Sequence, residues 1–275
     1  MKNRTLSIVM ILLIVLCIGF LTYFMIHAMK DNSFILFGKK TVIDEISYDT
    51  EYDEEINYIS IDGNLANVNI KESDTNKFKL LIHSKKDKTD VKINNKKLYI
   101  HTEMDTCKFL CFNEKVAQID IYVPREYKDE IKINNSIGDI KIANIESLNL
   151  NIETKTGDIK IDKVLKCYIK TKTGDININS VDDLEIETKV GDIEIASVTG
   201  VLDIETKTGD IKINNVEIKD NSHITTDVGD IKIKNTYDIY VDAKTDVGDT
   251  KVNNNNRKSE IELSIKTRVG DIKVN

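Results

Sequence analysis

The dipeptide Gly-Asp occurs eight times in the second half of the chain, and it constrains the fold more than any other feature. Successive glycines are separated by 19, 17, 17, 18, 20, 19 and 22 residues. A period near 19 residues is typical of stacked repeats, in which each repeat contacts only its neighbours. We interpret each dipeptide as a structural turn, because glycine tolerates positive φ and aspartate is a common turn residue. The turn residues are Gly138, Asp139, Gly157, Asp158, Gly174, Asp175, Gly191, Asp192, Gly209, Asp210, Gly229, Asp230, Gly248, Asp249, Gly270 and Asp271.

Apolar and polar residues alternate on both sides of each turn, as they do in strands with one buried face. The columns seven and five residues before the glycine are mainly Leu and Ile, and those two and four residues after it are mainly Ile. The residues three and one before the glycine have the same phase, so we expect both to face inward. The inward threonines, whose hydroxyls can hydrogen-bond along a ladder, are Thr154, Thr171, Thr188, Thr206, Thr226, Thr245 and Thr267.

These patterns predict an all-β fold, a single-stranded β-solenoid (β-helix) with coils of about 19 residues. Like residues then stack about 4.8 Å apart. A meander of hairpins with Gly-Asp as the turn is the alternative, but it does not explain columns of identical residues. We expect regular repeats over 131–275, and an N-terminal cap with degenerate coils over 56–130. A charged fraction of 31% fits this fold, since every second residue of a strand faces water.

Residues 6–26 carry no charge and are long enough to cross a bilayer as a helix. Lys2 and Arg4 precede them, so residues 1–5 are expected in the cytoplasm and the rest outside. A cleaved signal peptide is the alternative, but its apolar region spans only about 7–15 residues. We therefore expect a single-pass signal anchor in the cell membrane. A polar tether over 27–55 then leads to an extracytoplasmic C-terminal domain.

The strand end Ile119-Asp120-Ile121-Tyr122-Val123-Pro124-Arg125 is followed by serial Thr-Lys-Thr-Gly-Asp-Ile-Lys-Ile units. This combination resembles the bacterial "putative adhesin" family of β-strand-repeat envelope proteins, whose function is largely undefined. The resemblance covers residues 56–275. It implies a β-helix exposed at the cell envelope, often behind a membrane anchor, and a link of some relatives to envelope-stress loci. The family has no established catalytic residues, so the resemblance assigns none here.

The most distinctive outward column lies two residues before the glycine. It contains Lys155, Lys172, Lys189 and Lys207, and then turns to aspartate. We take these four lysines as the candidate binding face for an envelope protein or a glycan. The formal net charge of −7 disfavours nucleic acid as a partner. Because the chain ends directly after a Gly-Asp strand, we also expect end-on self-association through the C-terminal coil.

The sequence leaves three alternatives open: a calcium site, an enzyme and a disulfide. The stacked aspartates can bind Ca²⁺, although calcium β-rolls use a glycine-richer nonapeptide. A β-helix polysaccharide-processing enzyme would need a polar cluster that breaks the repeat on one face. Cys107 and Cys111 can form a disulfide only across a turn, because a strand would hold them about 13 Å apart. The leading hypothesis is a non-enzymatic, adhesin-like binding or scaffold protein without a cofactor.

Overall fold

The computed structural model of the chain describes residues 41–75, 77–104, 115–146, 148–253 and 255–275. Nearly all of them belong to one compact unit, Val42–Asp105 with Val116–Asn275. Of the other unit, Met1–Thr41 with Thr106–Lys115, only the boundary residues Thr41 and Lys115 are described. The described part of the larger unit is built from β-strands, together with one short 3₁₀ turn, η1 (Lys86–Lys88).

Two predictions fall outside the described residues. They are the membrane anchor over 6–26 and the Cys107–Cys111 disulfide. Within the described ranges, no helix has the length and apolar character needed to span a bilayer.

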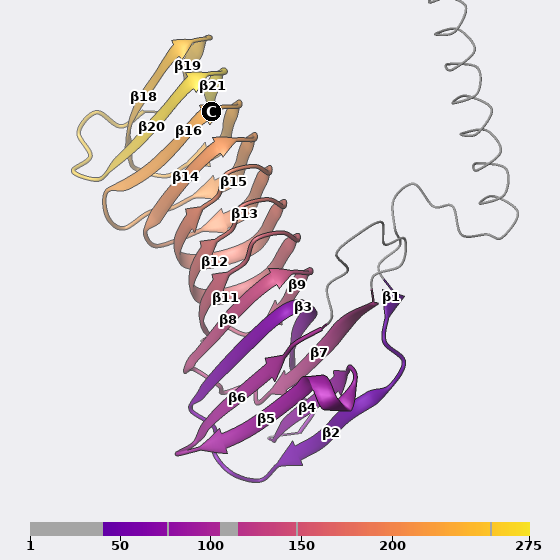
Figure 1. Ribbon diagram of the computed structural model, residues 1–275. Coiled ribbons are helices and arrows are strands. Elements are labelled where there is room, and N and C mark those ends of the chain that lie inside the picture. The colour runs from indigo at the N-terminus through magenta and orange to yellow at the C-terminus, as the bar shows by residue number, and fades with distance from the viewer. Residues whose placement is uncertain (1–40, 76, 105–114, 147, 254) are drawn as a thin grey trace, which may run out of the picture. The chain divides into compact units, whose positions relative to one another are not determined.

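Each regular coil consists of a strand before a Gly-Asp turn and a strand after it (Figure 1). The strands before the turns include β8 (Glu130–Ile137), β10 (Asn149–Glu153), β14 (Leu202–Thr208), β16 (Ser222–Val228), β18 (Tyr240–Val247) and β20 (Glu262–Val269). The strands after the turns include β9 (Ile140–Asn144), β13 (Ile193–Val198), β15 (Ile211–Val216), β17 (Ile231–Thr236), β19 (Thr250–Val252) and β21 (Ile272–Val274). Two longer strands, β11 (Ile159–Lys170) and β12 (Ile176–Glu187), each follow one Gly-Asp turn and continue to the next, so each belongs to two successive coils.

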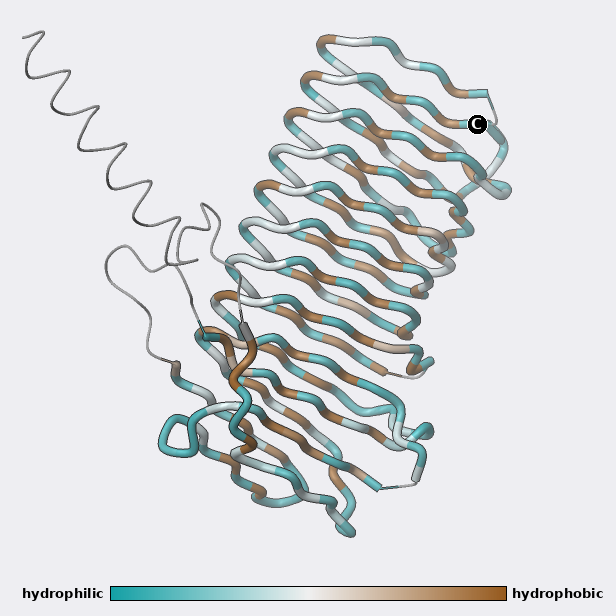
Figure 2. The backbone as a smooth tube through the Cα atoms, turned by 90° about the vertical axis from the view of Figure 1, so that its right-hand side faces the viewer, coloured by the Kyte–Doolittle hydropathy of each residue, from teal (hydrophilic) through white to brown (hydrophobic). Residues whose placement is uncertain are grey.

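Neighbouring coils pair in parallel, and equivalent residues stack in register. Ile159 pairs with Ile140 on one side and with Ile176 on the other. This register confirms the predicted β-solenoid and excludes the hairpin meander, whose neighbouring strands would be antiparallel. Figure 2 shows hydrophobic and hydrophilic residues alternating along the coils.

The core is a set of aliphatic rows on the inner face of the coils. Ile152, Ile169 and Ile186 form one such row, and each is at most 1% exposed. Burying one side chain of this size contributes about 1.5–3 kcal/mol. The alternation does not predict a further buried row, seven residues after each glycine, because its phase shifts by one residue between the fourth and the seventh position. Val164, Val181 and Val198 belong to it.

The prediction that the residue directly before the glycine faces inward is wrong. Val190 is 49% exposed and Val247 is 62% exposed. The preceding lysine or aspartate is exposed as well, so two consecutive residues face solvent. The chain begins to turn directly after the buried threonine, and the alternation of the strand ends there.

The N-terminal strands cover one end of the stack. They are β1 (Thr41–Val42), β2 (Ile46–Tyr52), β3 (Tyr58–Glu72), β4 (Phe78–His83), β5 (Thr89–Asn94), β6 (Lys97–Thr102) and β7 (Lys115–Val123). β3 forms the first coil, since it pairs in parallel with β8 and then with β9. β4 lies antiparallel between β2 and β7, and β5 is antiparallel to β6.

The assignment of residues 27–55 to a tether is wrong for residues 46–52, which form β2. Tyr48 and Tyr52 of this strand pack against the core. Burial raises the pKa of Tyr52 to about 12. The acidic composition of the segment conceals the alternation of Ile46, Tyr48 and Tyr52 with polar residues.

The last two coils do not stack in chain order. β20 pairs with β16 on one side and with β18 on the other. β21 likewise lies between β17 and β19. The C-terminal coil is therefore inside the stack, and β18 with β19 forms the outermost coil (Figure 1). The prediction of a free edge on the C-terminal coil, and with it the proposed route to end-on self-association, is wrong.

The sequence of the outermost coil explains why it occupies the end. Ala243 and Thr250 replace the isoleucines that the other coils place in these two inward columns. These replacements reduce the apolar surface that the last coil leaves in water. Stacking in chain order would instead expose the isoleucines of β20 and β21.

Charge and edge protection favour the same order. The register aligns Arg268 with Asp227 on one side and with Asp246 on the other, whereas chain order would set the two aspartates side by side. At the free edge, the Oδ1 atom of Asn255 accepts a hydrogen bond from the amide of Val241 at 2.9 Å. Its Nδ2 atom donates to the carbonyl of Val241 at 3.0 Å. Asn255 thereby covers part of an edge that is otherwise open to another strand.

Candidate functional site

Each Gly-Asp turn stacks directly on the turn of the neighbouring coil. The eight glycines have φ values between 139° and 152°, a region that residues with a side chain rarely adopt. A Cβ atom on Gly191 would lie 2.1 Å from the carbonyl oxygen of Gly174. The turns therefore leave no space for a side chain, and the glycine column is a requirement of the stack.

The aspartates of the turns form a hydrogen-bonded ladder with the backbone. The amide of Asp192 donates to Oδ1 of Asp175 at 2.9 Å, and the amide of Asp210 donates to Oδ1 of Asp192 at 2.8 Å. In the same way, the amides of Asp158, Asp175, Asp230, Asp271 and Asp249 donate to the carboxylates of Asp139, Asp158, Asp210, Asp230 and Asp271, respectively. The ladder thus follows the spatial order of the coils rather than the chain order.

The first coil continues this ladder with a different residue. Asn67 accepts a hydrogen bond through Oδ1 from the amide of Asp139 at 3.1 Å. Further along the ladder, the amide of Asp271 and the ammonium of Lys232 hold the pKa of Asp230 below its usual value. No cluster of three or more His, Cys, Asp or Glu side chains within the described ranges is arranged to hold a metal ion.

Replacing Asp192 by alanine is expected to lower the free energy of unfolding by about 1 kcal/mol, because the amide of Asp210 loses its acceptor. Asp192→Asn is the matched control, since it keeps an oxygen at the same place and is expected to lose much less. Urea unfolding followed by circular dichroism measures both variants. Equal losses for the two would show that the negative charge matters and the hydrogen bond does not.

The predicted inward threonines lie beneath the coil surface. Thr154, Thr171, Thr188 and Thr206 are between 2% and 7% exposed. Their hydroxyls, and that of Thr226, have no hydrogen-bond partner among the described residues. Thr245 and Thr267 instead donate to the carbonyls of Gly270 and Gly229, at 2.9 and 3.3 Å. The expected ladder of hydrogen bonds from threonine to threonine is therefore not formed by these residues.

Cys167 stands in the inward leucine column and is 4% exposed. Burial raises the pKa of its thiol. A thiol that stays protonated is a poor nucleophile, so this cysteine offers no reactive centre.

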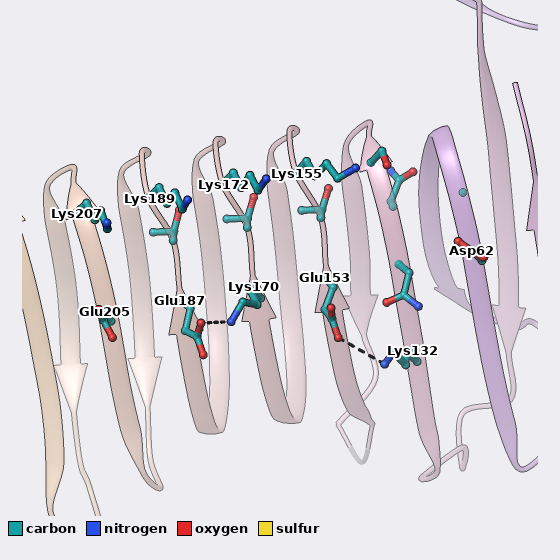
Figure 3. A pocket seen from close by; sticks show the side chains of 17 residues that line it. Asp62, Lys132, Glu153, Lys155, Lys170, Lys172, Glu187, Lys189, Glu205 and Lys207 are labelled. Carbon is teal, nitrogen blue, oxygen red and sulfur yellow. Dashed lines mark hydrogen bonds and ion pairs between the residues drawn. The ribbon is translucent and has the colours of Figure 1, made fainter. Parts of the chain in front are cut away.

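A groove of about 640 Å³ crosses the ends of the strands that precede the turns. It extends from β3 and β8 to β14, and Figure 3 shows its side chains. Six lysines and four carboxylates line it, giving the groove a net charge of +2 in a chain whose net charge is −7. The charged lining residues are Asp62, Lys132, Glu153, Lys155, Lys170, Lys172, Glu187, Lys189, Glu205 and Lys207.

Two lysines of the groove form ion pairs with glutamates of the same groove. The ammonium of Lys132 lies 3.5 Å from the carboxylate of Glu153. Lys170 forms an ion pair with Glu187, and this contact raises the pKa of Lys170. Figure 3 marks both contacts, which join one coil to the next.

The other four lysines of the groove form no ion pair with a carboxylate of the described residues. We call Lys155, Lys172, Lys189 and Lys207 the lysine row, and it coincides with the binding face predicted from the sequence. Its members stand beside the turns of four successive coils, about one coil spacing of 4.8 Å apart. Among the described residues, no carboxylate forms an ion pair with any of them.

The ion-paired residues of the groove were not predicted from the sequence. Glu153, Lys170 and Glu187 occupy the outward column four residues before the glycine, next to the lysine row. Register places Lys170 between the two glutamates. The change of sign along this column was visible in the sequence and was the signal for pairing between coils.

The model of the family described as Toastrack DUF4097 matches residues 56–275. No curated protein matches the chain in sequence. A crystal structure of a putative adhesin from Bacteroides fragilis has a TM-score of 0.47 at 17% identity, covering 84% of this chain and 98% of that chain. A crystal structure of a putative lipid binding protein from Parabacteroides distasonis has a TM-score of 0.48 at 16% identity, covering 86% of this chain and 100% of that chain.

Proposed function

The chain belongs to the Toastrack DUF4097 family, and we propose that it is a non-enzymatic, adhesin-like binding or scaffold protein of the bacterial cell envelope. The proposal includes residues 6–26 as a single-pass membrane anchor and the solenoid as the part outside the cell. The uncharged segment after Lys2 and Arg4 supports this topology.

The lysine row is the observation that carries the proposed binding role. Its four ammonium groups form no ion pair with any carboxylate of the described residues, while neighbouring lysines of the same groove pair with glutamates. Exposed charge of one sign without internal partners attracts a partner of the opposite sign. The coils hold the backbone of these lysines at fixed positions, so only their side chains need ordering when a partner binds.

The repetition of the groove supports a non-enzymatic role. A catalytic site brings together one constellation of unlike groups around a single reacting atom. The lysine row presents the same group at each of four coils. Such repetition suits a long or repeated partner better than one transition state.

Photo-crosslinking in intact cells tests the proposal. A photoreactive residue placed at Lys189, in the lysine row, is expected to capture an envelope component. The same residue placed at Lys160, which is exposed on a strand after the turn, is the matched control and is expected to capture much less. Equal capture at both positions, or none at either, would overturn the binding role.

Protease added to the same cells tests the topology. The solenoid is expected to be digested from outside, while the cytoplasmic residues 1–5 stay protected. Complete protection of the solenoid, together with digestion in lysed cells, would overturn the extracytoplasmic placement.

A further inference from the structure

We infer that the lysine row binds a linear polyanion, a flexible polymer that carries a phosphate or carboxylate group at regular intervals. This inference rests on the proposed function and names the class of its ligand.

The positive charge of the lysine row is not balanced by neighbouring carboxylates of the described residues. Four ammonium groups follow one another at single-coil spacing, so each repels its neighbours. The chain has 46 acidic residues, yet none of the described ones forms an ion pair with the row. The adjacent column shows that this fold readily pairs lysines across coils, as Lys170 does with Glu187. A bound polyanion would relieve the repulsion that the fold leaves in place.

The row also has defined ends. Register aligns Lys155 with Ser136 in the coil on one side. It aligns Lys207 with Asp227 in the coil on the other side. The row is therefore bounded by an uncharged residue and by a negative one. Three coil steps separate its ends, a length of about 14 Å. A single phosphate cannot span this distance, whereas a polymer contacts all four lysines at once and gains affinity from their number.

The composition of the groove favours a soluble polymer over nucleic acid or lipid. Proteins that bind single-stranded nucleic acid stack its bases on aromatic side chains, and no aromatic residue lines this groove. Peripheral binding to a bilayer relies on large apolar side chains that enter it. None of the exposed large apolar residues of the described chain lines the groove either. The groove instead presents a row of exposed lysines, and buried threonines such as Thr171 and Thr188 line it beneath them.

The test measures binding of the full chain, held in phosphatidylcholine nanodiscs, to long-chain polyphosphate and to poly-L-glutamate. Inorganic phosphate, oligodeoxythymidine and vesicles containing phosphatidylglycerol are measured alongside. We expect both polymers to bind and inorganic phosphate to bind far more weakly. If all four lysines engage, the logarithm of the affinity is expected to fall with the logarithm of salt concentration with a slope of about 3.

Two matched variants locate the contact. The first replaces the lysine row, as K155Q, K172Q, K189Q and K207Q. The second, K141Q, K160Q, K251Q and K273Q, removes the same charge from the column three residues after the glycine. These four lysines make no ion pair with described carboxylates, whereas Lys212 and Lys232 of the same column do. The first variant is expected to lose about tenfold or more in polymer affinity and most of the salt slope, and the second to lose little. Circular dichroism checks that both are folded, and the single variant K189E serves if the first is not.

Equal losses in the two variants would show a general charge effect and overturn the inference. Binding to oligodeoxythymidine or to the anionic vesicles, without binding to either polymer, would overturn it as well. If polymer binding fails while photo-crosslinking at Lys189 still captures an envelope component, the inference is wrong and the proposed function stands.

Discussion

Replacing Gly174 by alanine is expected to lower the free energy of unfolding by about 3–5 kcal/mol, through backbone strain and overpacking together. The new Cβ atom would lie 2.1 Å from the carbonyl oxygen of Gly157 and 2.7 Å from its carbonyl carbon. The φ of +144° adds strain for any residue with a side chain. The turn has little freedom to move, because the amides of Gly157 and Gly174 both donate to the next coil, at 3.1 Å each.

The control for this variant is Gly63→Ala in the first coil. Gly63 is not at a positive φ, and its Cβ would meet side-chain atoms at 3.2 Å, which small shifts can accommodate. Its loss is expected to be less than half that of Gly174→Ala. Thermal and urea unfolding of the purified variants, followed by circular dichroism, give the comparison. A Gly174→Ala variant as stable as the native chain would contradict the stacked turns.

Pairs of introduced cysteines are expected to show the order of the last coils, because a disulfide forms only between residues of adjacent coils. Lys232 pairs with Lys273, and Lys273 pairs with Lys251, so each of these pairs is one strand spacing apart. A spacing of about 4.8 Å is within reach of a disulfide, whereas the two spacings between positions 232 and 251 are not. We expect bridges for 232–273 and 251–273, and none for 232–251.

Peptide mapping by mass spectrometry without reduction detects these bridges. All three double variants remove two exposed lysines, so each controls for the charge change in the others. Cys17, Cys107 and Cys111 are replaced beforehand, and the buried Cys167 is left in place. A bridge between positions 232 and 251, with none between 232 and 273, would mean that the coils stack in chain order.

The periodicity of the sequence was sufficient to predict the stack itself. The alternation around each Gly-Asp dipeptide indicates which residues face inward. Residues at the same position relative to the glycine are neighbours in adjacent coils, so the repeat also indicates which residues stack on one another. Alternation fails where the backbone leaves the extended conformation. Val190 and Val247 were assigned to the wrong face for this reason, since the chain turns one residue earlier than the pattern indicates.

Coil order was harder to predict, because the last three coils share the same Gly-Asp register and the same threonine column, so register alone accepts any order. Ala243 and Thr250 were the signal, since the outermost coil is the place for the least apolar inward face. The lysine row of the groove was also visible as a column. Pairing within the groove was not, because it depends on how far Lys132 and Lys170 reach across the coil boundary.

The exchanged order of the last coils has a consequence for how the chain folds during synthesis. Residues 240–252 leave the ribosome before residues 262–274, while the edge of β16 and β17 is still free. The earlier coil can therefore occupy that edge first, in the same Gly-Asp register, although Asp246 then lies beside Asp227. The native stack forms only when the later coil takes this place and the earlier coil moves outward over it. The distal end of the solenoid is thus expected to mature last, by displacement rather than by simple addition.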